Sequence, residues 1–147
     1  MGLTRRSTAI WNGSGKEGNG TLTSTSGVLN NTPYSAGLRF GNEEGKAGTN
    51  PEELIAAAHA GCFAMALSFG LSGAGLTADE LKATAHVQLE PKPAGGFEIT
   101  GIMLEVVGKV PGASAEQFQQ IANGAKDGCP VSTALKAVPI TLQATLA

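Results

Sequence analysis

The order of the predicted elements along the 147 residues indicates an α+β fold, with antiparallel sheet and central helices packed on it. Strand-like segments come first, a long apolar helix follows, and then two strands, a helix and a closing strand. This order lacks the regular strand–helix–strand repeat that is typical of parallel sheets. The length suits one domain with a sizeable core, so we expect residues 1–147 to form a single domain.

The first third of the chain has the pattern of short strands joined by turns and loops. Its strand-like segments are rich in β-branched side chains, which favour extended backbone. Clusters of Gly, Asn, Ser and Pro separate them and mark the connections. In order, we expect strand 8–11, loop 12–20, strand 21–26, turn 27–33 and, after Leu38, Arg39 and Phe40, a charged glycine-rich loop at 41–49.

A helix is predicted from residue 51, because three separate start signals meet there. Asn50 stands at the capping position, Pro51 at the first helical position, and Glu53 completes a capping-box pattern. Glycines within 70–75 end the helix. Polar and glycine residues interrupt its apolar run, 54–71, so we expect a buried core helix rather than a membrane span.

The second half of the chain predicts a hairpin, two helices and a closing strand. A capping pattern at Ser114 and Gln117 begins the first of these helices, and Gly128 ends it. Cys129 followed by Pro130 indicates a new helix, with the cysteine at the cap and proline at the first position. The expected segments are strands 84–90 and 97–107, a helix from 114 to about 126, a helix through 135 and strand 138–146.

Composition and charge exclude several classes of protein. The chain is 41% hydrophobic and 15% charged, which is typical of a globular protein rather than a disordered one. The net charge is −2 and Lys and Arg form no stripe, so nucleic acid is not an expected partner. The N-terminus lacks the apolar segment of a secretory signal, and we expect a cytoplasmic protein without membrane association.

The two cysteines occupy different kinds of position. Cys129 stands at a helix N-terminus, where free backbone N–H groups favour a thiolate, although it could also be an ordinary cap. Cys62 lies within the apolar helix, where a small core hydrophobe is the plain alternative. A zinc site would need both to converge with His59 and His86. The spacing of such sites is missing, so no metal is expected.

Two thiols are the minimum for a peroxide-reducing cycle. A thiolate reduces a peroxide and becomes a sulfenic acid, and a second thiol condenses with it to a disulfide. In a cytoplasmic chain, disulfides are usually transient and catalytic or redox-sensing. The pair therefore favours a redox role over a purely structural one.

Two motifs around the cysteines resemble those of a known family. Residues 50–67, NPEELIAAAHAGCFAMAL, are similar to the signature helix of the OsmC/Ohr family of organic hydroperoxide thiol peroxidases. Residues 128–132, GCPVS, resemble the second-cysteine motif of that family. The opening segments GVLN at 27–30 and PY at 33–34 are similar to the OsmC branch rather than the Ohr branch. The resemblance covers essentially the whole chain.

The resemblance implies a fold, a reaction and a set of site residues. It implies an intertwined homodimer of OsmC-like fold that reduces organic hydroperoxides, with lipid hydroperoxides as one candidate, without metal, flavin or other cofactor. Cys62 would be the peroxidatic cysteine and Cys129 the resolving one, joined in a Cys62–Cys129 disulfide. Arg39 would stabilise the thiolate, and Glu52 would orient Arg39. The implied reductant is a dithiol of the dihydrolipoyl type.

Helix geometry adds a constraint on this site. Glu52 and Cys62 are ten residues apart, which is roughly 15 Å along a straight helix, so they cannot serve one site from the same helix. We therefore expect Glu52 to serve the Cys62 of the partner chain. An antiparallel crossing of two helices near the alanines at 56–58 would place them opposite each other, in a composite site across a two-fold axis.

Several assignments stay open at this stage. Phe63 and Met65 are candidates for lining an apolar substrate pocket, with plain core packing as the alternative. A non-catalytic redox sensor or binding protein, switched by the Cys62–Cys129 disulfide, is the alternative function. A cysteine-dependent hydrolase is disfavoured, because His59 lies only three residues from Cys62 and no third group is evident to orient it. We expect His59 to be structural.

Overall fold

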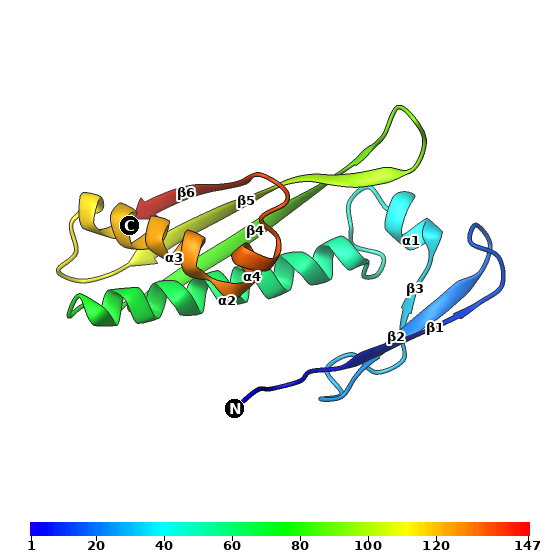
Figure 1. Cartoon of the computed structure of the whole chain (residues 1–147), viewed down its shortest axis with the longest axis horizontal. Coiled ribbons are helices and arrows are strands. Elements are labelled where there is room, and N and C mark those ends of the chain that lie inside the picture. The colour runs from blue at the N-terminus through cyan, green and yellow to red at the C-terminus, as the bar shows by residue number, and fades with distance from the viewer. The chain divides into compact units, whose positions relative to one another are not determined.

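The computed structural model describes all residues, 1–147, and divides into two compact units, Met1–Leu54 and Ile55–Ala147 (Figure 1). Each unit is described by itself. The α+β class predicted from the order of the elements is confirmed, since both units combine a small sheet with helical segments. The expectation of a single domain stays a prediction.

The N-terminal unit contains a three-stranded antiparallel sheet in the order β1-β2-β3. Leu22 in the middle strand pairs with Ala9 on one side and with Thr32 on the other. The predicted turn at 27–33 is present, with Gly27 at φ 82°, a conformation that glycine adopts without strain. The end of that segment forms a third strand that the sequence did not indicate. The strands are β1 (Ser7–Asn12), β2 (Asn19–Ser24) and β3 (Thr32–Tyr34).

A short helix, α1 (Ala36–Phe40), follows the sheet where no helix was predicted. The Ser35 hydroxyl accepts a hydrogen bond from the Leu38 N–H at 3.1 Å and caps its first turn. Gly41 closes the helix by donating its N–H to the Gly37 carbonyl at 2.9 Å. One turn is too short to produce a helical repeat in the sequence, but it fixes the position of Arg39.

Helix α2 (Pro51–Gly73) begins and ends as predicted. The Asn50 side chain accepts a hydrogen bond from the Glu53 N–H at 2.8 Å, so the capping residue identified in the sequence does cap the helix. By length and apolar composition α2 would also suffice to cross a membrane, a property that it shares with core helices of soluble proteins. The absence of membrane association therefore remains a prediction.

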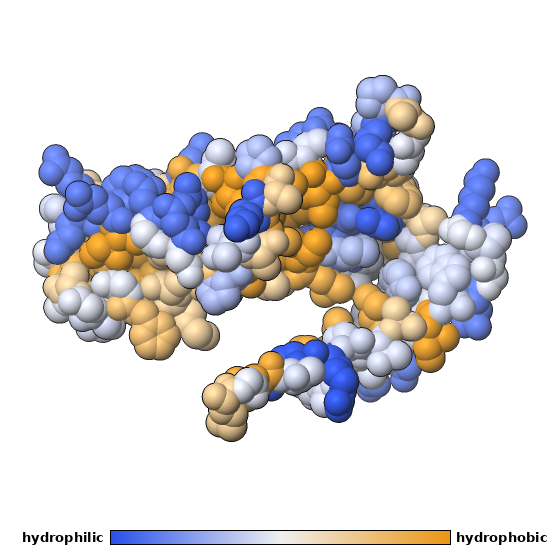
Figure 2. All heavy atoms as spheres, viewed as in Figure 1, coloured by the Kyte–Doolittle hydropathy of each residue, from blue (hydrophilic) through white to orange (hydrophobic).

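Only one face of α2 is buried in the single chain. The part of α2 that belongs to the C-terminal unit buries four side chains that are spaced four residues apart, as one helix face requires. They are His59, Phe63, Leu67 and Leu71. The expectation of a buried core helix is therefore correct for this face. The other face is exposed and apolar, and Figure 2 shows pale to orange side chains where α2 runs in Figure 1. We call this exposed set the open face of α2: Ala57, Ala58, Gly61, Met65 and Phe69.

The C-terminal unit holds the second sheet, in the order β4-β5-β6. β4 and β5 form a long antiparallel hairpin, while β6 pairs parallel to β5, with Leu142 opposite Leu104. The predicted antiparallel pairing is thus confirmed for β1–β3 and for β4–β5, and β6 makes the second sheet mixed. Two helices carry the chain back to the end where β5 began, which is what a parallel pair requires. The elements are β4 (Glu80–Pro91), β5 (Phe97–Lys109), α3 (Ala115–Gly128), α4 (Pro130–Ala134) and β6 (Ile140–Leu146).

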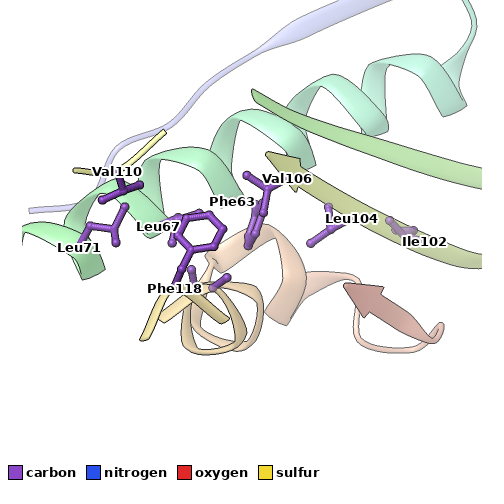
Figure 3. Close-up of a cluster of buried hydrophobic side chains, with 10 residues drawn as sticks. Phe63, Leu67, Leu71, Ile102, Leu104, Val106, Val110 and Phe118 are labelled. Atoms are coloured by element: carbon purple, nitrogen blue, oxygen red, sulfur yellow. The ribbon is translucent and has the colours of Figure 1, made fainter. Parts of the chain in front are cut away.

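The core of this unit lies where α2, β5 and α3 meet (Figure 3). α2 contributes Phe63 and Leu67, α3 contributes Phe118, and β5 contributes a row of buried aliphatic side chains. Gly108 lets Phe118 pack directly on β5, since a Cβ at position 108 would come within 2.5 Å of the Phe118 ring. This packing fixes α2 and α3 against one sheet and thereby positions Cys62.

Candidate active site

Two cysteines that are far apart in the sequence lie side by side in the C-terminal unit. Cys62 on α2 and Cys129 at the start of α4 are separated by 67 residues, and their Sγ atoms are 2.9 Å apart. Both are free thiols. Cys129 is fully buried, whereas Cys62 is only partly buried. The structure thus brings together the two cysteines that the sequence singled out.

The junction of α3 and α4 explains the position of Cys129. α3 ends at Gly128, and the Cys129 N–H donates to the Ala125 carbonyl at 3.0 Å as the C-cap. Pro130 then begins α4, at a position where no N–H is needed. Cys129 is therefore both the C-cap of α3 and the N-cap of α4. Its side chain makes no cap hydrogen bond, which leaves the sulfur to face Cys62.

The two thiols differ in how readily they lose a proton. Burial raises the pKa of Cys62, and its contact with Cys129 raises it further. Burial also acts to raise the pKa of Cys129, but the polar groups near its sulfur outweigh this effect and lower the pKa overall. These groups are the Cys62 thiol, the backbone and hydroxyl of Ser132, and the backbone of Val131. Within this unit the thiolate therefore forms on Cys129 before it forms on Cys62.

A buried histidine lies close to this pair. His59 is 0% exposed, and its Nε2 is 2.7 Å from the Oγ of Ser132, a residue of α4 that is 5% exposed. Burial lowers the pKa of His59, so the imidazole is neutral near pH 7. Its Nδ1 is buried without a hydrogen-bond partner. Ser132 was not predicted as a site residue, and its signal in the sequence is its place at the end of the motif GCPVS, one turn after Cys129.

The predicted contact between Arg39 and Glu52 is present in the N-terminal unit. The Arg39 guanidinium donates from Nη2 to Glu52 Oε1 at 2.6 Å and from Nε to both carboxylate oxygens at 3.2 Å. Glu52 is 8% exposed and lies in the first turn of α2, where the helix dipole favours a carboxylate. The guanidinium also lies 5.0 Å from the ring centre of Phe40. These contacts hold Arg39 in one orientation.

The four predicted catalytic residues thus form two pairs, one in each compact unit. Arg39 and Glu52 belong to Met1–Leu54, and both cysteines belong to Ile55–Ala147. The roles of Arg39 and Glu52 toward a Cys62 thiolate stay predictions. Because Arg39 and Glu52 contact each other within one chain, a subunit that supplies one of them to a site supplies the other as well.

The two predicted pocket residues have opposite surroundings. Phe63 is 0% exposed and is enclosed by the core cluster, which agrees with the core-packing alternative stated from the sequence, and its role in a substrate pocket stays a prediction (Figure 3). Its position on the buried face of α2 directs the side chain toward β5 and α3. Met65 is 64% exposed and belongs to the open face of α2. Its role in a substrate pocket stays a prediction.

Truncating these two side chains should have very different effects on stability. We expect Phe63→Ala to lower the free energy of unfolding by about 3–5 kcal/mol, because it leaves a cavity in the core. Met65→Ala, the matched control on the exposed face, should change it by less than about 0.5 kcal/mol. Urea denaturation followed by circular dichroism measures both. A stable Phe63→Ala chain with a raised KM for hydroperoxide would instead support the pocket role of Phe63.

The arrangement of side chains supports thiol chemistry. The structure brings no three His, Cys, Asp or Glu side chains together as a candidate metal site. The two sulfur atoms, at 2.9 Å, need to approach by roughly 0.9 Å to reach the length of a disulfide bond. The pair can therefore alternate between dithiol and disulfide with little movement of the chain. An α+β fold that holds two free thiols in this way defines a dithiol redox protein.

Comparison with known proteins identifies the family. Residues 41–143 match the family model described as OsmC-like protein. The chain is 50% identical over 137 residues to peroxiredoxin OsmC of Escherichia coli K12, and this match covers 93% of each chain. It is 33% identical over 118 residues to the organic hydroperoxide resistance protein OhrB of Bacillus subtilis 168, covering 80% of this chain and 82% of that one. The chain therefore belongs to the OsmC-like family.

Solved structures agree with this assignment. The crystal structure of OhrB from Bacillus subtilis has a TM-score of 0.73 and 29% identity, and covers 99% of this chain and 98% of that one. The OsmC-like protein from Mycoplasma pneumoniae has a TM-score of 0.76 at 18% identity, covers 100% of this chain and 99% of that one, and supports the fold alone. The resemblance stated from the sequence is thus confirmed, and the chain is an enzyme of the peroxidase type.

Proposed function

We propose that the chain reduces organic hydroperoxides to alcohols through a cycle of its two cysteines. The Cys62 thiolate attacks a peroxide oxygen, the O–O bond breaks, and the alcohol leaves with one proton while Cys62 becomes a sulfenic acid. Cys129 then attacks the Cys62 sulfur and displaces water, which forms the Cys62–Cys129 disulfide. The observation that carries this proposal is the 2.9 Å separation of the two sulfur atoms.

The substrate and reductant follow from the chemistry of this cycle and from the relatives. Three relatives are named organic hydroperoxide resistance proteins, which supports an organic peroxide as substrate, with lipid hydroperoxides as one candidate. Each turnover leaves a disulfide that needs two electrons and two protons. We propose a dithiol of the dihydrolipoyl type as their source, and a cytoplasmic location, where such disulfides are normally transient.

A composite site in a homodimer would account for the acidity of the two thiols. Because Cys129 loses its proton more readily than Cys62 within one unit, an additional cation is needed to favour a Cys62 thiolate. Arg39, already paired with Glu52, is suited to supply that charge. We propose that it comes from the partner chain. The open face of α2 supports this arrangement, since its alanines and Gly61 would allow a second α2 to approach closely.

Thiol counting tests the proposed cycle. Reduced protein is mixed with sub-stoichiometric cumene hydroperoxide, and free thiols are counted by mass spectrometry. We expect two thiols to be lost for each peroxide within seconds, as an intramolecular Cys62–Cys129 disulfide that dihydrolipoamide reverses. Repeated turnover with excess peroxide and reductant separates an enzyme from a redox sensor, which would be oxidised once and recover slowly. Two thiols still free after minutes would contradict the proposal.

A further inference from the structure

We propose that Ser132, held in place by His59, stabilises Cys129 as the leaving thiolate when a dithiol reductant opens the Cys62–Cys129 disulfide. Ser132 and His59 would be positioning residues for the reductive half of the cycle. This inference rests on the proposed function, because it assumes that the disulfide is formed and reduced in each turnover. It is carried by the burial of the two cysteines and by the hydrogen bond that holds Ser132 to His59, one helical turn after Cys129.

Burial indicates which sulfur the reductant attacks. Cys129 is 0% exposed, while Cys62 retains some exposure, so an incoming thiolate reaches the Cys62 sulfur. The new bond joins the reductant to Cys62, the Cys62–Cys129 bond breaks, and its electron pair goes to Cys129. The second thiol of the reductant then displaces Cys62 and closes the reductant's own disulfide. The protein gains two electrons and, with them, two protons, which the reductant loses.

Ser132 is placed to receive the charge that develops on Cys129. It is the third residue of α4, for which Cys129 is the cap, so the two side chains share one face of the first turn. Its hydroxyl and its N–H lower the pKa of the Cys129 thiol, so both act as donors toward a thiolate at that position. A neutral disulfide sulfur accepts such bonds weakly, whereas a thiolate accepts them strongly. The bonds therefore gain strength as the disulfide breaks, and leaving-group stabilisation of this kind speeds the exchange.

The buried imidazole fixes the direction in which the Ser132 hydroxyl donates. Nδ1 of His59 has no partner, and buried N–H groups without an acceptor are rarer than unpaired acceptors. The proton therefore belongs on Nε2, which donates to the Ser132 Oγ at 2.7 Å. That leaves the hydroxyl hydrogen free to point at the Cys129 sulfur. The relay runs from His59 through Ser132 to Cys129.

Other charged groups approach the same region. Besides Cys62 and His59 on α2, the end of α3 contributes Lys126 and Asp127, and Lys136 follows α4. The two lysines and Asp127 line a cavity of about 380 Å³ together with Ser132 and Thr133. A substitution of Ser132 leaves the charges of these neighbouring residues unchanged. A comparison of Ser132 variants therefore measures the effect of the hydroxyl alone. Thr133 offers a matched control, because its hydroxyl bonds the Cys129 carbonyl at 3.4 Å.

The test uses a disulfide made with diamide, so that it does not depend on peroxide. Wild type, Ser132→Ala and Thr133→Ala are oxidised, and their reduction by dihydrolipoamide is followed by stopped flow. We expect Ser132→Ala to be reduced about tenfold more slowly, the usual weight of one hydrogen bond to a charged group. Thr133→Ala should match wild type, and Ser132→Thr should restore most of the rate. Equal rates in all four chains would overturn the inference.

A titration gives a second readout that does not involve turnover. In a Cys62→Ser background, absorbance at 240 nm reports the single remaining thiolate. Ser132→Ala should raise the pKa of Cys129, and His59→Phe should raise it in the same direction, because both remove donors from the relay. His59→Gln, which keeps a donor, should restore the lower pKa. A titration unaffected by Ser132→Ala would overturn the inference, whereas failure of peroxide to oxidise wild type would overturn only the proposed function.

Discussion

Replacing Cys62 by serine is expected to abolish peroxide turnover, while Cys129→Ser should consume about one peroxide per chain and then stop. The two effects differ because only Cys62 is accessible enough to meet a peroxide, and only Cys129 lies close enough to resolve its sulfenic acid. Consumption of cumene hydroperoxide, with dihydrolipoamide as reductant, measures the first effect. The second appears as a single-turnover burst when each variant is mixed with excess peroxide.

The product formed in the Cys129→Ser chain provides the control. Dimedone should label Cys62 in that variant, since a sulfenic acid without a resolving thiol persists, and it should label neither cysteine in wild type at completion. Sustained turnover in the Cys62→Ser chain would mean that Cys129 reacts with peroxide directly. That outcome would reverse the roles assigned to the two thiols.

The second large effect is expected at Arg39. Arg39→Met should slow the formation of the sulfenic acid by on the order of 100-fold, because it removes the cation that favours a Cys62 thiolate. Arg39→Lys should recover part of the rate, as lysine keeps the charge but cannot reproduce the three hydrogen bonds to Glu52. Stopped-flow fluorescence or rapid quenching of the peroxide reaction measures these rates. An unchanged rate in Arg39→Met would remove this residue from the site.

Mixed dimers test which chain supplies Arg39. A heterodimer of one Arg39→Met subunit and one Cys62→Ser subunit is purified with two different affinity tags. If Arg39 acts across the two-fold axis, the intact Arg39 meets the intact Cys62, and the heterodimer should have about half of wild-type activity. If Arg39 acts within its own chain, the heterodimer should be inactive. The two homodimeric variants, both nearly inactive, serve as controls.

The sequence predicted most of what local chemistry determines. The start of α2 was placed correctly because Asn50, Pro51 and Glu53 each act within one turn, and the structure shows the Asn50 cap. The two cysteines were identified because their motifs are short and specific. The contact between Arg39 and Glu52 was also anticipated, but from the family resemblance rather than from the spacing of the two residues.

The features that were missed depend on contacts between distant segments. α1 has five residues, too few for a periodic pattern, and its helix depends on the Ser35 cap. The parallel pairing of β6 with β5 is decided by the crossover of α3 and α4, which no strand pattern records. Likewise, Ser132 became a candidate only when folding brought it to His59, 73 residues away.

The sequence separation of the two cysteines gives their oxidation a thermodynamic side effect. A Cys62–Cys129 disulfide ties together points 67 residues apart, so it removes many conformations from the unfolded chain and hardly alters the folded one. Loop-closure entropy puts this stabilisation at about 4 kcal/mol. Each catalytic turnover would therefore alternate between a more and a less robust molecule, and the enzyme would resist unfolding most while peroxide is abundant.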